Sequence, residues 1–179
     1  MRTKRLKGTK RLNKVMTKTL RPFGISKTKL GNDYGYFLYN SNIEFRLIDE
    51  TKEDKWFNEF CEEEFGYTVR NNFIISLLHE IGHHKTLWDI YENMYLEDFC
   101  LDEKARIDAE IATAKDEAEV RKLEFEYFKL PDEYFATRWA VEYAKTHEKE
   151  LDEMWDKMRK IIIWFYLKNK VITKEMLKK

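Results

Sequence analysis

The chain has 179 residues, of which 37% are charged and 15% are aromatic, and its formal net charge is zero. That length suits a single compact domain, and the aromatic share excludes an intrinsically disordered chain. Two cysteines are too few for a disulfide framework. No run of about 18 consecutive apolar residues is present, which excludes a membrane-spanning helix. The basic start is not followed by an apolar segment, so we expect no secretory signal peptide. We therefore expect a cytoplasmic protein, located in the host cytoplasm or in the virion if a phage encodes it.

The first 32 residues form a basic segment, in which every charged side chain before Asp33 is a lysine or an arginine. Its low apolar content and its glycines predict a flexible arm, followed by one domain over residues 33–179. Such an arm could bind nucleic acid, an acidic membrane or an acidic partner surface. It could equally be a solvated tail that docks on the acidic remainder of the chain.

Residues 34–71 predict a small sheet and one helix. Two apolar runs, 36–39 and 43–48, flank the polar tripeptide 40–42, which is typical of an antiparallel hairpin. Large apolar residues at helical spacing between Trp56 and Phe65 then predict a helix that ends at Gly66.

The second half of the chain predicts further helices. Residues 102–128 are highly charged and predict a long solvated helix or a helical hairpin. They have a thin apolar face that could also form a subunit contact, made of Ile107, Ile111, Ala114 and Ala118. Pro131 opens another helix through about Thr146, and a last amphipathic helix follows from Leu151. The predicted fold class is therefore α+β, mostly helical, with a small antiparallel sheet.

The helix expected over residues 72–86 carries the sequence His79-Glu80-Ile81-Gly82-His83. Two histidines four residues apart lie on one helix face, so both imidazoles can reach one zinc ion at bond lengths of about 2.0–2.1 Å. Glu80 lies beside the first histidine and can activate a zinc-bound water as a base. Gly82 costs about 1 kcal/mol in a helix interior, which indicates a place where a side chain would obstruct close packing. The alternative is coincidence, because the same pattern occurs by chance in long helices.

A catalytic zinc needs a third protein ligand beside one open position. The later segment Glu133-Tyr134-Phe135-Ala136-Thr137-Arg138-Trp139-Ala140, taken with the first motif, resembles the gluzincin metallopeptidases, and more closely their small intracellular members of the ImmA/IrrE type. The resemblance covers about residues 34–146 and makes 102–128 a charged helical insertion. It implies a zincin-like domain with an active-site helix, zinc held by His79, His83 and Glu133, and Glu80 as the base. Thr137 departs from the family pattern, which has Asp or Asn there to support a ligand histidine.

Other residues compete for roles at this site. Asp89, six residues after His83, and the distal His147 are alternatives to Glu133 as third ligand, ranked behind it. His84 lies beside the ligand pair but on another part of the helix surface. Arg138, His147 and several tyrosines are candidates for the donor that stabilises an oxyanion.

The sequence thus predicts a zinc-dependent peptidase that hydrolyses peptide bonds of a specific intracellular protein substrate, with Zn²⁺ as cofactor and Glu80 activating a zinc-bound water. The alternative is a catalytically silent, zinc-stabilised binding or phage-particle protein. In that case the basic residues 1–32 would contact nucleic acid or an acidic partner.

Overall fold

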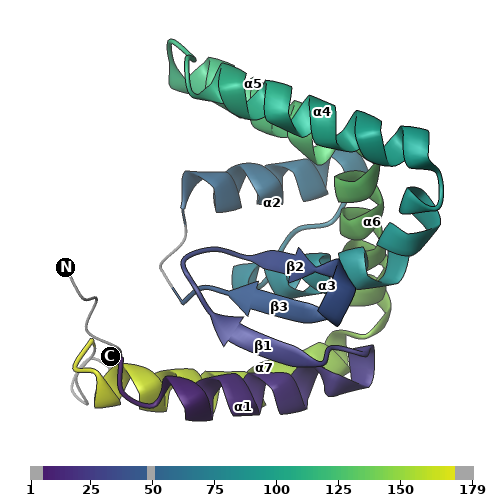
Figure 1. The fold of residues 1–179 in the computed structure, drawn as a ribbon. Helices are drawn as coiled ribbons and strands as arrows, with labels where there is room; N and C mark the ends of the chain where they lie inside the picture. Colours follow the sequence, from purple (N-terminus) through teal and green to yellow (C-terminus); the bar gives the residue numbers. More distant parts are fainter. Residues whose placement is uncertain (1–5, 48–50, 172–179) are drawn as a thin grey trace. The chain divides into compact units, whose positions relative to one another are not determined.

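The computed structural model describes residues 6–47 and 51–171 (Figure 1). It is mostly helical with one small sheet, which confirms the predicted α+β class. The chain divides into two compact units. The first unit combines the residues up to Leu47 with those from Glu148 onward, and the second runs from Ile48 to His147.

The first unit consists of a three-stranded sheet and two long helices. Helix α1 spans Thr9–Leu20, the strands are β1 (Lys27–Leu30), β2 (Gly35–Phe37) and β3 (Asn42–Phe45), and helix α7 spans Glu148–Lys168. Short 3₁₀ turns, η1 (Arg21–Phe23) and η2 (Leu38–Asn40), connect them. The strand order is β1-β3-β2. β3 pairs with β2 antiparallel, as the sequence predicts, and with β1 in parallel, so the sheet is mixed.

The basic segment is ordered over its described residues. Leu12, Met16 and Leu20 are fully buried along one face of α1, which packs against β1 and α7. The Thr28 hydroxyl of β1 donates a hydrogen bond of 2.9 Å to the Asn13 carbonyl of α1. Helix and strand both belong to the first unit, so the boundary expected at residue 32 does not coincide with the division of the structure.

The second unit is built from five helices in its described residues: α2 (Lys52–Phe65), α3 (Asn72–Tyr91), α4 (Met94–Ile111), α5 (Glu117–Phe128) and α6 (Pro131–Thr146). The helix starts follow from local chemistry. Thr51 and Asp54 form a capping box at α2, the Asn71 side chain accepts a hydrogen bond from the backbone of Ile74 at α3, and Pro131 is the first residue of α6.

The charged stretch 102–128 lies in a helical hairpin formed by α4 and α5, which run side by side (Figure 1). Ile107 of α4 and Leu123 of α5 pack in a small core with Leu130, which precedes α6. α4 begins at Met94, earlier than the charged stretch itself. No helix in the described ranges combines the length and the apolar character that crossing a membrane requires.

Candidate metal centre

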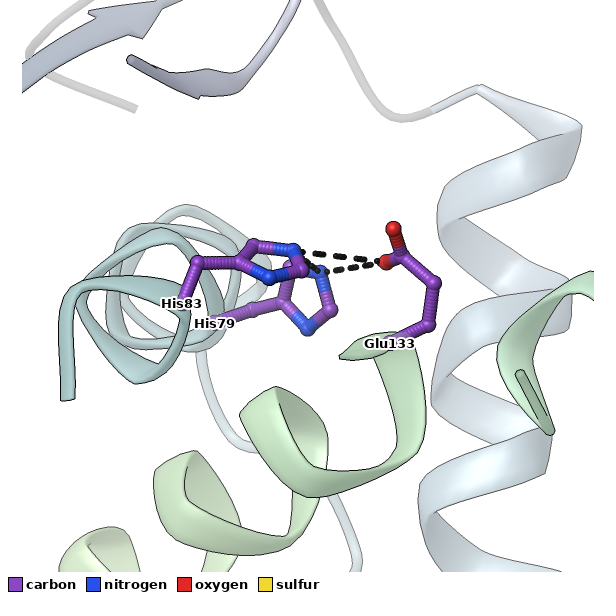
Figure 2. Close-up of side chains that lie close together, drawn as sticks. All are labelled: His79, His83 and Glu133. Atoms are coloured by element: carbon purple, nitrogen blue, oxygen red, sulfur yellow. Dashed lines mark hydrogen bonds and ion pairs between the residues drawn. The ribbon is translucent and has the colours of Figure 1, made fainter. Parts of the chain in front are cut away.

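The predicted motif lies in the middle of α3, whose inner face is apolar. Ile74, Leu77, Leu78 and Ile81 are all buried, as their helical spacing predicts. The helix continues to Tyr91, five residues beyond the expected end. His79 and His83 point from successive turns of this helix toward one residue of α6, Glu133 (Figure 2).

Gly82 allows the backbones of α3 and α6 to approach each other closely. A Cβ atom at this position would lie 2.3 Å from the backbone oxygen of Ala136. Ala136 and Ala140, the small residues on the facing side of α6, are themselves fully buried. The prediction that a side chain at residue 82 would obstruct close packing is confirmed, and the close packing places Glu133 opposite the two histidines.

Three possible ligand atoms converge at this crossing. The Nε2 atom of His79 lies 3.0 Å from Oε2 of Glu133 and 3.1 Å from Nε2 of His83, and the latter is 3.4 Å from the same Oε2 (Figure 2). Ligands bound at about 2.0–2.1 Å in a tetrahedral zinc site are separated by about 3.3–3.4 Å. The three atoms, 3.0–3.4 Å apart, are therefore close enough to share one ion after small shifts.

Thr137 fixes which nitrogen of His79 carries the proton. Its hydroxyl donates a hydrogen bond of 2.8 Å to the Glu133 carbonyl, and it can then only accept from Nδ1–H of His79, which lies 3.0 Å away. The lone pair of His79 is thereby left on Nε2, where it faces the other two candidate ligands. A threonine thus makes the supporting contact for which the resembled family uses Asp or Asn. His83 differs, because its buried Nδ1 has no hydrogen-bond partner among the described residues.

The centre also balances a buried charge. Glu133 is only 5% exposed. Burial alone raises the pKa of its carboxyl, but the charge of His83 and the polar contacts with both histidines outweigh that effect and hold the pKa well below its usual range. The carboxyl of Glu133 is therefore held in its ionised form, in which it can bind a metal ion.

The second carboxylate oxygen of Glu133 is held by residues that the sequence analysis did not single out. Lys104 of α4 places its Nζ 2.5 Å from Oε1 of Glu133 and 2.6 Å from Oδ2 of Asp132. The hydroxyl of Tyr127, from α5, donates to the same Oε1 at 3.2 Å, and that of Tyr91 donates to Asp132 at 3.0 Å. Burial lowers the pKa of Lys104, but the charge of Glu133 and then those of Tyr127 and Asp132 reverse the effect and raise it. The charged hairpin therefore supplies side chains to the centre.

The remaining predicted residues lie in different places. Glu80 is buried on α3, 6% exposed, in the turn between the two histidines. His147 ends α6, where its ring stacks on Tyr143, and Arg138 pairs on the exposed side of α6 with Glu142. Neither residue belongs to the converging group.

The same holds for the other histidine and for the remaining alternative ligand. Asp89 is exposed, and burial and the neighbouring Lys85 lower the pKa of the half-buried His84. Of the three residues considered as third ligand, Glu133 alone lies with the histidines in the described part of the chain.

Comparisons with models of protein families, with curated proteins and with solved structures give no match to this chain. The geometry of the centre is therefore the guide to the function of this protein.

Proposed function

We propose that this protein is a zinc-dependent peptidase that hydrolyses peptide bonds of a specific intracellular protein substrate. The observation that carries the proposal is the group of His79, which is partly buried, and His83 and Glu133, which are buried; their ligand atoms all lie within 4.8 Å of one another. Two neutral imidazoles and one carboxylate form the donor set of zinc sites that keep one position open for chemistry. The resemblance to gluzincin metallopeptidases supports the same assignment.

In this proposal one group of residues binds the ion, and another residue transfers a proton. His79, His83 and Glu133 hold the ion, and Thr137 keeps His79 in the tautomer that can bind it. A bound zinc supplies Lewis acidity, which polarises a carbonyl and makes water a stronger acid. Glu80 accepts the proton of the attacking water on its carboxylate and delivers it to the nitrogen of the leaving amine. Its burial keeps bulk water from competing for that proton.

Zinc content measured on purified variants tests the ligand set. We expect about one zinc per chain in the wild type, lost in Glu133→Ala and kept in His147→Ala, which removes the competing ligand. Glu142→Ala is the matched control, because it removes an exposed glutamate from the same helix. Circular dichroism shows whether each variant is folded. A folded wild type that takes up no zinc would refute the site.

Peptide cleavage tests the base. Glu80→Gln should retain zinc and lose turnover, because the amide cannot accept the proton. Cleavage at the wild-type rate would show that another group is the base. If no variant and no wild type cleaves any protein while zinc removal unfolds the chain, the silent zinc-stabilised alternative holds instead.

A second candidate function is binding of a polyanion such as nucleic acid by the first unit. Lys10, Lys14 and Lys18 are exposed at four-residue spacing along α1, and none forms an ion pair within the described residues. Such a row can follow the phosphates of a nucleic acid, and its affinity should fall steeply with salt. The triple alanine variant should lose most of this affinity, whereas alanine at Lys157 and Lys160, exposed on α7, should not. Equal binding by both variants would exclude this surface.

A further inference from the structure

We infer that Lys104 is a positioning residue for the metal centre: its tethered positive charge keeps the ligands assembled without metal and restricts Glu133 to one metal-binding oxygen, at the expense of metal affinity. The inference rests on the proposed metal site and adds a role for the charged hairpin of α4 and α5. It concerns a residue that acts through Glu133.

The two oxygens of Glu133 face different partners. Oε2 lies 3.0 Å from Nε2 of His79, whereas Oε1 lies 2.5 Å from Nζ of Lys104 and 3.2 Å from the hydroxyl of Tyr127. A carboxylate that is held at one oxygen by an ammonium and a phenol offers only the other oxygen to an ion. The arrangement therefore leaves free a coordination position that a bidentate glutamate, bound through both oxygens, would fill.

Lys104 also compensates two buried negative charges. Asp132 and Glu133 are consecutive and only 1% and 5% exposed. Nζ of Lys104 contacts both, and the backbone N–H of Glu133 donates to Oδ1 of Asp132 at 3.0 Å. A buried carboxylate that loses its only cationic partner strongly destabilises the folded state. Without metal, the lysine thus helps to keep the start of α6 in place.

The same charge opposes a metal ion. An ion bound to Oε2 would share the Glu133 carboxylate with the ammonium of Lys104, and two cations at that range repel each other in a buried site. Removing the lysine charge should therefore destabilise the metal-free protein and strengthen zinc binding. A lysine with a purely structural role would behave differently, because its loss would weaken both.

The test compares Lys104→Met with the wild type and with Lys122→Met. Lys122 is a matched control, because it belongs to the same hairpin and its side chain is 77% exposed in an i,i+4 pair with Glu126. Zinc affinity is measured by competition with a chelator at fixed pH, and the melting temperature is measured with and without zinc. For Lys104→Met we expect a lower melting temperature without zinc, a larger rise on adding zinc, and zinc affinity about tenfold higher or more. Lys122→Met should match the wild type.

Lys104→Gln covers the case in which the methionine variant fails to fold even with zinc. Glutamine keeps a hydrogen-bond donor but no charge, so it should also bind zinc more tightly than the wild type. Zinc bound by the wild type but no more tightly by Lys104→Met or Lys104→Gln would overturn the role of Lys104 and leave the metal centre standing. Zinc bound by none of these proteins would overturn the metal centre and this inference together.

Discussion

Substituting Gly82 by alanine tests whether the close approach of α3 and α6 builds the metal centre. The added Cβ would lie 2.3 Å from the oxygen, 2.8 Å from the carbon and 2.9 Å from the Cα of Ala136. All three are backbone atoms, so no side chain can rotate away. The two helices must therefore separate until that contact reaches at least the 3.0–3.4 Å at which tight Cβ contacts occur.

Two opposing effects determine the change in stability. Alanine in place of glycine in a helix interior favours folding by about 1 kcal/mol. Overpacking at a tightly packed position disfavours it by about 1–3 kcal/mol, and more where backbone must move. We expect the overpacking to dominate, because it concerns the backbone of α6, and to lower the free energy of unfolding by about 1–2 kcal/mol. A domain of ordinary stability, about 5–15 kcal/mol, remains folded after such a loss.

The substitution should affect zinc affinity more than the free energy of unfolding. Separating the helices by the same distance carries Glu133 away from the histidines, so the 3.0 Å between its Oε2 and Nε2 of His79 would grow to about 4 Å. Zinc holds its ligands about 3.3–3.4 Å apart, and binding sites tolerate errors of only about 0.5 Å. We expect zinc affinity to fall about tenfold or more.

Urea unfolding and chelator competition measure the two effects separately. Gly35→Ala is the control, because a Cβ at Gly35 meets nothing within 4 Å. An alanine at residue 82 that stabilises the protein, as helix propensity alone predicts, and leaves zinc affinity unchanged would refute the argument from close packing.

Two further predictions concern other polar groups of the second unit. Thr137→Val removes the hydroxyl that accepts a hydrogen bond from His79, so zinc affinity should fall about 10- to 100-fold in chelator competition. An unchanged affinity would show that a group other than Thr137 determines the tautomer of His79. Burial, followed by the charges of Glu53 and Asp108, raises the pKa of Glu124 to about 7. The folded state therefore holds the proton of the Glu124 carboxyl more tightly than the unfolded state does. Because of this difference, the protein loses stability as the pH rises from about 4.5 through 7. Glu124→Gln should therefore be more stable than the wild type at pH 8, by about 1 kcal/mol after solvent screening of this half-buried group, but not at pH 4. A pH-independent difference in urea unfolding would contradict the assignment.

Local sequence signals predicted the parts of the centre that lie within one helix. The four-residue spacing of His79 and His83 determines that they share a face, whatever the rest of the fold does. Pro131 marks the first turn of α6 and so places Glu133 near its start. Gly82 indicated a close neighbour, because an interior glycine costs a helix about 1 kcal/mol, and a Cβ at this position would meet the backbone of Ala136.

Interactions between distant segments were not predictable in the same way. β1 pairs in parallel with β3 across a connection, and nothing in either strand specifies that register. The apolar face of α1, with Leu12, Met16 and Leu20, is narrow and lies among lysines, so the segment resembles a solvated arm until α7 covers it. Lys104 is one lysine among many in a charged stretch. Its role exists only once α4 lies against the start of α6.

The contacts around Glu133 bear on the choice between an enzyme and a zinc-stabilised scaffold. Structural zinc sites use four protein ligands and often supply much of the folding free energy. The described residues bring three possible ligands together, and Lys104 and Tyr127 already hold one of them through the oxygen that faces away from the histidines. The role proposed for Lys104 predicts a centre that is assembled without zinc and that binds zinc less tightly. These expectations favour the proposed peptidase over a zinc-stabilised scaffold, because a glutamate that binds through one oxygen leaves a coordination position free for chemistry.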